Sequence, residues 1–288
     1  MCCFTGNVIG VNNTGIFARA VDGDQYLVYQ MTYEAEAELA MVLPLPAPPN
    51  PSEDAVRFVD LSGYPDFFKH AQKGFDWIKY KPKEPDFEPT LSSSRDRLEV
   101  HAVGSYEASF VPRMADFSRL DPRFRLSEAV WAALPQYADW SFCVFKLKAG
   151  DVTVHPMAFR FPRRDPLRLY FPTVHVHDGS VRRTAWFNHF LFCQGKVPPA
   201  PWYVSRRLPD SWHKFLQDED DKERRRILKP PTPYLEQVRL YEATVAASPP
   251  LAARDFMNVS NALGVLDADT PLHRHRLFGE LPNRDHYV

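Results

Sequence analysis

Apolar and polar residues alternate along residues 14–33, on both sides of the turn sequence Asp22-Gly23-Asp24. Alternation places one face of a strand in the core and the other outside it, and Asp-Gly readily adopts the positive φ angles of a two-residue turn. The pattern predicts a β-hairpin over residues 14–33. A third apolar run over residues 39–43 precedes PLPAPPNPSED, and its prolines predict an extended connection because proline fixes φ and lacks a backbone donor.

A helical pattern occurs near residues 64–80, where the apolar side chains recur at intervals of three and four positions. The residues on this face are Phe67, Phe68, Ala71, Phe75 and Ile78, and Ser62 or Asp66 is available as N-cap. A shorter helix is predicted at residues 127–134, with Ser127 as N-cap and Pro135 as the stop. Two further candidate helices lie over residues 233–267 in the C-terminal third.

The middle third has the strongest strand character. Its β-branched and aromatic runs cover residues 140–148, 152–161, 167–177 and 180–192, with turns at residues 149–151 and at Asp178-Gly179. These runs predict two consecutive hairpins of an antiparallel sheet. The fold class predicted is α+β, mainly antiparallel β in one sheet or two packed sheets, with peripheral helices. Residues 1–195 are predicted to form a β-rich core domain, and residues 196–288 a proline-rich, helical extension packed on the same core as one structural unit.

Composition narrows the class of protein. Apolar residues make up 44% of the 288 positions, which is typical of a globular protein with a core. The 35 basic and 36 acidic residues leave no excess positive charge, so a nucleic-acid partner is not expected. No apolar stretch reaches the length of a membrane span, the N-terminus lacks a signal-peptide pattern, and the four cysteines form no disulfide framework. We expect a cytoplasmic protein with free thiols and no membrane partner.

A metal site is the first chemical hypothesis. His175 and His177 are two residues apart on a predicted strand, so their side chains point to the same face. Imidazole, thiolate and carboxylate groups are ligands of a transition metal such as zinc. The candidate ligands are His175, His177, Asp178, His189 and Cys193. The alternative is that these histidines are neutral, hydrogen-bonded side chains at the rim of a sheet.

Cys2 supports a different hypothesis. If Met1 is removed, Cys2 carries both a free α-amine and a thiol, which is the requirement for an N-terminal nucleophile hydrolase. The start MCCF, followed by a strand and by Arg19 and Asp22, resembles the choloylglycine-hydrolase and penicillin-acylase group. That resemblance implies a catalytic set of Cys2, Arg19 and Asp22, since the matching arginine and aspartate of the group lie next to the cysteine. Cys2-Cys3 could instead be a thiol pair for metal or redox work, or two small apolar residues that open a buried strand.

The chain as a whole resembles a family of uncharacterised proteins that begin with MCCF. The matching blocks are MCCFTGNV, VLPLP, DFSRLDPRF, HPMAF and FPTVHVHDG, in this order. A fainter likeness, in QYLVYQMTYEAEAELAMVLPLP, is to a bacterial VLPVP-type domain of unknown function. Both resemblances imply a β-rich fold and neither implies an activity.

Three functions remain open from the sequence. The leading hypothesis is a metal- or small-molecule-binding protein, with a metalloenzyme as one form of it, centred on the His-x-His strand. The second is an amidase-like hydrolase that uses Cys2, and the third is a non-catalytic interaction module. The partner is accordingly a small molecule or a protein, and the sequence leaves open whether the chain is an enzyme. No Walker loop, GxGxxG or GxSxG motif supports nucleotide binding or serine-hydrolase chemistry.

Overall fold

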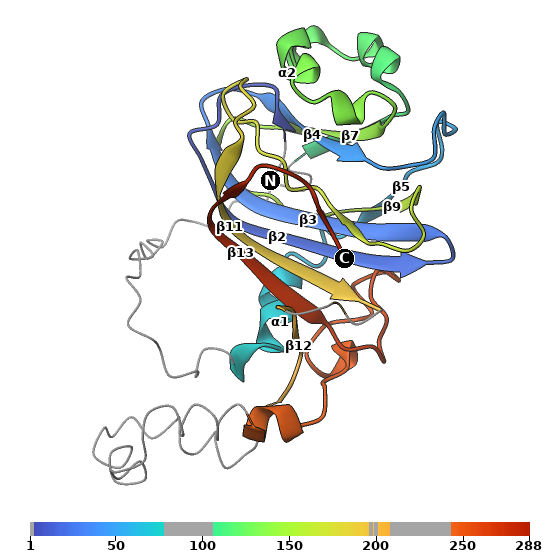
Figure 1. Cartoon of the computed structure of the whole chain (residues 1–288), viewed down its shortest axis with the longest axis vertical. Helices are drawn as coiled ribbons and strands as arrows, with labels where there is room; N and C mark the ends of the chain where they lie inside the picture. Colours follow the sequence, from blue (N-terminus) through green and yellow to red (C-terminus); the bar gives the residue numbers. More distant parts are fainter. Residues whose placement is uncertain (1–2, 78–105, 196–197, 199–200, 208–242) are drawn as a thin grey trace, which may run out of the picture.

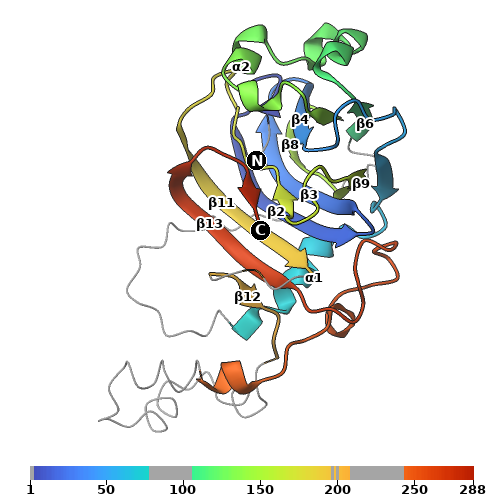
Figure 2. The same cartoon turned by 45° about the vertical axis from the view of Figure 1, so that its right-hand side comes forward.

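The structure is a computed structural model, and it describes residues 3–77, 106–195, 198, 201–207 and 243–288. Two β-sheets face each other, and short helices lie on their outer faces (Figures 1 and 2). The protein is mainly antiparallel β with few helices, which confirms the predicted fold class. None of the described helices is long and apolar enough to span a bilayer.

The smaller sheet has four strands and the larger has eight. The order in the smaller sheet is β1 (Cys3–Phe4), β4 (Leu39–Leu45), β7 (Ser141–Leu147) and β6 (Tyr106–Val111). The order in the larger sheet is β12 (Tyr203–Val204), β13 (His273–Pro282), β11 (Thr184–Gln194), β2 (Gly10–Val21), β3 (Asp24–Ala35), β9 (Met157–Pro162) and β5 (Arg57–Asp60), with β8 (Gly150–Thr153) also paired to β3. The pair of β11 with β2 is parallel, and β10 (Tyr170–Phe171) pairs separately with β14 (His286–Tyr287).

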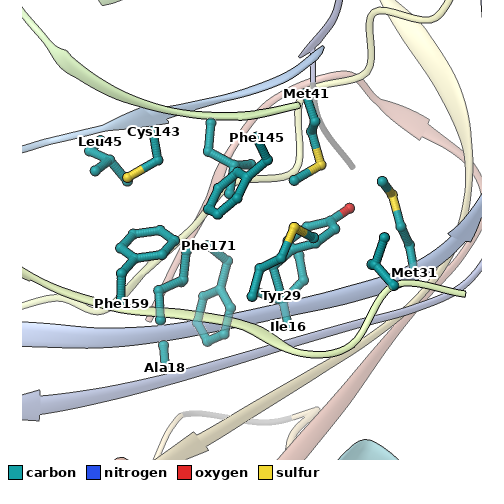
Figure 3. Packing of buried hydrophobic residues seen from close by; sticks show 14 of the residues in the cluster. Ile16, Ala18, Tyr29, Met31, Met41, Leu45, Cys143, Phe145, Phe159 and Phe171 are labelled. Atoms are coloured by element: carbon teal, nitrogen blue, oxygen red, sulfur yellow. The ribbon is translucent and has the colours of Figure 1, made fainter. Parts of the chain in front are cut away.

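Three apolar clusters hold these layers together. The first fills the space between the two sheets, where Ile16, Tyr29 and Met31 of the larger sheet face Met41 and other residues of the smaller one (Figure 3). The second lies between the larger sheet and α1 (Phe67–Lys73), and the third lies between the smaller sheet and α2 (Glu128–Ala132). Because both faces of the smaller sheet are covered, every residue of β4 is buried, which explains its uninterrupted apolar sequence LAMVLPL.

The local predictions with a turn or cap signal are confirmed. β2 and β3 form the first hairpin, and its turn residues Asp22 and Gly23 have φ angles of 46° and 87°. The helix α2 begins after Ser127, whose side chain accepts a hydrogen bond from the Val130 N–H at 3.3 Å. The helix predicted near residues 64–80 exists but is shorter, since α1 ends at Lys73. The part of that prediction beyond residue 77 lies outside the described residues.

The predicted strand partners in the middle third are wrong. Residues 172–183 do not pair with β11, and among the described residues their one bridge joins Val176 to Cys3 of the smaller sheet. β11 pairs instead with β2 and β13. Likewise, β7 and β8 are consecutive in sequence but belong to different sheets. Alternation of apolar and polar residues identifies the buried face of a strand but does not identify the neighbouring strand. Residues 172–183 and β11 both bury apolar side chains without pairing with each other.

The C-terminal part of the chain is integral to the sheet. Residues 208–242 lie outside the described residues, while residues 243–247 form one turn of helix. The segment predicted to be a helical extension also supplies β12, β13 and β14, and β13 lies between β11 and β12. Residues after 195 therefore build one side of the larger sheet.

A buried carboxylate fastens the tail between the sheets. Asp285 accepts hydrogen bonds from the Tyr137 O–H at 2.5 Å, the Thr173 N–H at 2.8 Å and the Val174 N–H at 3.3 Å. Burial raises the pKa of Asp285 above its ordinary value. This side chain joins the tail, the segment after β10 and the helical layer above the smaller sheet.

We therefore expect Asp285→Ala to lower the free energy of unfolding by about 2–4 kcal/mol, because it leaves two buried N–H groups and one hydroxyl without an acceptor. Asp285→Asn keeps an acceptor oxygen for Thr173 and Val174 and should cost less than half as much. Urea denaturation at pH 7 measures both variants. Equal losses for alanine and asparagine would show that these hydrogen bonds do not fasten the tail.

Candidate functional site

His175 and His177 lie side by side at the rim between the two sheets. Their rings stack with centroids 5.2 Å apart and planes 15° from parallel. The Asn283 side chain clamps the backbone of His175, because Oδ1 accepts from its N–H at 2.7 Å and Nδ2 donates to its carbonyl at 2.9 Å. His189 of β11 lies behind the pair, 5.2 Å from the His175 ring. The structure thus brings together three of the predicted ligands.

Burial keeps these imidazoles uncharged. It lowers the pKa of His177 to about 4 and the pKa values of His175 and His189 further, and repulsion from neighbouring imidazoles acts in the same direction on His175 and His189. The nearby His286 also has its pKa lowered to about 4, chiefly by burial, and its Nδ1 lies 2.8 Å from the Thr173 hydroxyl. Nε2 of His175 is enclosed and has no hydrogen-bond partner among the described residues. The cluster is neutral at physiological pH.

A cavity of about 500 Å³ opens beside the two histidines. Its lining residues are His175, His177, Asp178, Ser180, Arg182, Thr184, Ala185, Trp186, Glu280 and Asn283. Asp178 accepts hydrogen bonds from the Ser180 N–H at 3.1 Å and from the Arg182 guanidinium at 2.8 Å. Its pKa is lowered to about 2, mainly by hydrogen bonding from Ser180. Asp178 therefore acts as the acceptor of its own turn.

The proposed metal ligands do not form a metal centre in the structure. Cys193 is four residues beyond His189 on β11, which places the two Cα atoms about 13 Å apart along the strand. The Cys193 thiol is buried, and burial raises its pKa well above the ordinary value. Within the described ranges, no group of three or more His, Cys, Asp or Glu side chains is arranged to hold one ion. The histidine cluster therefore lacks the Cys193 thiolate, and the Asp178 carboxylate beside it accepts hydrogen bonds within its own turn.

The predicted hydrolase residues are not gathered by the described part of the chain. Cys2 itself lies outside the described residues, and its neighbour Cys3 belongs to the smaller sheet. Arg19 lies near the end of β2 in the larger sheet, and Asp22 lies in the turn that follows the strand. The Arg19 guanidinium donates to the carbonyl oxygens of Val265 at 2.8 Å and Gly264 at 2.6 Å, so it holds the loop before β13. The catalytic role of these residues remains a prediction.

A second and larger concave site lies on the opposite face of the eight-stranded sheet. This groove of about 870 Å³ runs beside α1 and is lined by Asn13, Thr14, Gly15, Gln30, Thr32, Pro65, Phe68, Lys69, Gln72, Phe75, Thr153, Phe190, Phe192, Tyr203, Arg274 and Arg276. At its inner end the Phe68 ring of α1 lies directly on the backbone of Gly15, where a Cβ atom would come within 2.6 Å of the ring. A β-bulge between Asn12 and Gly15 interrupts the pairing of β2 at this point.

Aromatic rings and arginines alternate along the side of β11 and β13 that carries the groove. The register pairs Trp186 with Glu280, Asn188 with Phe278, Phe190 with Arg276, and Phe192 with Arg274. We call Trp186, Phe190, Arg274, Arg276 and Phe278 the aromatic-arginine face. Trp186 is 63% exposed and Phe278 is 44% exposed. Their rings meet edge to face, with centroids 5.8 Å apart.

The arginines of this face lie over its rings. Arg276 lies 4.3 Å from the Phe278 ring centroid and 5.4 Å from that of Phe190. Arg274 lies between Phe75 and Phe190, at 4.9 and 5.1 Å. This face is not among the sites expected from the sequence. The available signal was HRHRLFG, in which Arg274, Arg276 and Phe278 alternate with apolar or imidazole side chains and so share one side of a strand.

The described residues define a two-sheet β protein with a histidine cavity at the rim and an aromatic-arginine groove on the larger sheet. No family model matches the chain. Similar solved structures include baculovirus P35, at 14% identity over 72% of this chain and 78% of that chain with a TM-score of 0.44. A mutated P35 after caspase cleavage matches 69% of this chain and 78% of that chain, at 14% identity and a TM-score of 0.38. P35 in a caspase-8 complex matches 68% of this chain and 74% of that chain, at 12% identity and a TM-score of 0.36. At these identities and TM-scores, the likeness assigns neither a fold family nor a function.

The buried imidazoles predict that acid destabilises the fold. The folded-state pKa of His177 is about 4 and its unfolded value is about 6.5, so the unfolded chain binds protons first as pH falls through this window. Stability is therefore complete above about pH 6.5 and decreases toward pH 4. His177→Phe should remove one such group and gain on the order of 2 kcal/mol relative to the unsubstituted protein between pH 7 and pH 4.

Urea denaturation of both proteins at pH 7, 5.5 and 4 measures the difference. Asp285 acts in the opposite direction, because its raised pKa makes ionisation unfavourable to folding as pH rises above about 4. Its contribution is common to both proteins and cancels in the comparison. A difference that stays constant across the three pH values would contradict the neutral state of His177.

Proposed function

We propose that this chain is a non-catalytic interaction module that binds a protein partner through its aromatic-arginine face. The observation that carries the proposal is the exposure of Trp186 and Phe278 next to each other on a rigid sheet. Large aromatic side chains are seldom exposed in adjacent pairs, and contiguous exposed apolar surface often marks a binding site. Tryptophan, phenylalanine and arginine are also enriched at protein interfaces.

The construction of the face favours recognition over chemistry. Its side chains project from two long paired strands, β11 and β13, which share ten residue pairs in continuous register. Arg276 is held by its ring contacts and by a hydrogen bond from its guanidinium to Asn188 Oδ1 at 3.1 Å. A side chain already fixed in place loses little conformational entropy when a partner binds, so the face is pre-organised.

The state of the reactive side chains elsewhere in the described residues also supports a non-catalytic role. Cys143 and Cys193 are buried, and burial raises the pKa of both thiols, so neither supplies a thiolate nucleophile at neutral pH. His175 and His189 are held uncharged between the sheets. The burial of Cys193 supports a structural role for that thiol, which the metal hypothesis would use.

Substitution of the two exposed rings tests the proposal. We expect Trp186→Ser with Phe278→Ser to abolish capture of a partner, with a loss of at least about tenfold in affinity, because central aromatic residues commonly contribute 2 kcal/mol or more to binding. The matched control is Leu167→Ser, which changes a side chain that is 80% exposed on the loop before β10. Thermal unfolding confirms that all three proteins are folded.

The measurement is quantitative affinity capture from lysate, followed by titration of each candidate partner in purified form. A partner that supports the proposal is retained by the unsubstituted protein and by Leu167→Ser, is lost with the double variant, and shows the same order in the titration. If every captured protein binds all three equally, the aromatic-arginine face is not the binding surface.

A further inference from the structure

The groove beside α1 has an excess of positive charge. Its lining residues include Lys69, Arg274 and Arg276, and none of them is an aspartate or glutamate. Lys69 is exposed and lies 3.6 Å from Asp66, which lies outside the lining. The two arginines therefore dominate the potential inside the groove, and a low-dielectric wall of phenylalanine rings strengthens their attraction for an anion.

Arg274 is the more enclosed of the two. Its one hydrogen bond within the described residues runs from its guanidinium to Gln72 Oε1 at 2.7 Å, and its Nε is buried without a hydrogen-bond partner. Burial and repulsion from Arg276 lower the pKa of Arg274 to about 10, against smaller attractions from Tyr203 and Asp76. Buried charges in folded proteins are usually paired with an opposite charge. Here a neutral amide and two ring faces are the contacts of the guanidinium, so its charge is incompletely compensated.

Three of the other polar side chains of the groove, Gln30, Thr32 and Thr153, have partners in the protein. Gln30 donates from Nε2 to the carbonyl oxygens of Val154 at 3.0 Å and Pro65 at 3.2 Å. The hydroxyl groups of Thr32 and Thr153 lie 2.8 Å apart and share a hydrogen bond. The buried nitrogen without a hydrogen-bond partner therefore belongs to Arg274, and Phe68, Phe190 and Phe192 of the same groove offer apolar contact.

A single acidic group among apolar neighbours fits this arrangement better than a polyanion. Two arginines at one end of a groove match one carboxylate, whereas a nucleic-acid backbone requires a row of cations along its path. The exposed Glu280 lies opposite Trp186 on the same face and would repel a chain of phosphates. Arg276, which lines the groove, lies over the Phe278 ring, and that ring contacts Trp186; this row of contacts beyond the groove favours an extended occupant over a compact small molecule.

We propose that the groove beside α1 binds an extended, acidic polypeptide segment of the partner, in which an aspartate or glutamate pairs with Arg274 and Arg276 and a neighbouring apolar residue contacts Phe190 and Phe192. This inference rests on the proposed function and specifies the chemistry of the partner. Arg274 is the anchor, because a planar guanidinium can donate two parallel hydrogen bonds to one carboxylate.

The test uses full-length protein and blocked pentapeptides of defined sequence. The probe is acetyl-Leu-Asp-Phe-Asp-Leu-amide, and its matched control replaces both aspartates with asparagine. Binding is followed by NMR through the backbone amides of β11 and β13 and the Nε–H signals of the arginines. We expect saturable shifts at Arg274 with the aspartate peptide, at least tenfold weaker binding of the asparagine peptide, and weaker binding at higher salt.

Three variants locate the interaction. Arg274→Gln should weaken binding of the aspartate peptide at least tenfold, and Arg274→Lys should recover part of it, because lysine retains the charge but not the forked geometry. Arg57→Gln is the control, since Arg57 is exposed on β5 at the far edge of the sheet. No saturable shift up to about 1 mM peptide, or equal binding of both peptides, would overturn the inference.

Two further probes test whether the groove prefers nucleic acid or a small carboxylate to the peptide. Binding of a fifteen-residue oligothymidylate or of phenylacetate at the groove with higher affinity than the aspartate peptide would assign it to nucleic acid or to a small carboxylate and overturn the proposal. The captured partner separates failure of the acidic-segment inference from failure of the proposed interaction module. If Trp186→Ser with Phe278→Ser loses the partner but Arg274→Gln retains it, the acidic-segment inference fails while the interaction module stands.

Discussion

The carboxylate of Asp285 and its three donors determine where the last strands of the protein lie. Tyr137 belongs to the layer above the smaller sheet, Thr173 and Val174 belong to the segment after β10, and Asp285 belongs to the tail. The neighbouring Asn283 clamps the backbone of His175. Since β13 leads directly into these residues, the strand that carries Arg274 and Arg276 continues into the tail that holds the backbone of His175.

The side chains on the two faces of β11 lie in different surroundings. Phe187, His189 and Leu191 point into the space between the sheets, where burial removes charge from the imidazole. Trp186 and Phe190 point to the other side, where the rings are accessible and the adjacent arginines supply charge. The period of two in a strand makes this division possible within a few residues. The His189 ring and the arginines therefore lie on opposite sides of one sheet, and Trp186 at the rim also lines the histidine cavity.

Sequence reasoning succeeded where the signal was local and failed where it required a distant partner. The Asp22-Gly23 turn and the Ser127 cap each depend on residues within a few positions, and both were predictable. The partner of β11 was not, because β2 lies about 175 residues earlier and β13 about 90 residues later. The same limitation explains the candidate site: the adjacency of His175 and His177 was predictable from their spacing, while the approach of His189 and the pairing of Phe190 with Arg276 depend on the actual arrangement of the strands.

The parallel pairing of β11 with β2 also determines the order in which the molecule can be assembled. The β2–β3 hairpin can form as soon as its residues have been synthesised, but one edge of β2 has no strand beside it until β11 follows. The other edge of β11 stays unpaired until β13 has been synthesised, and β13 is complete only at Pro282. During translation, the growing chain therefore exposes an unpaired strand edge of the kind that promotes aggregation, and such non-local topologies fold slowly. A partly folded chain in which β2 and β3 have paired without β11 therefore carries an exposed strand edge that the finished sheet covers.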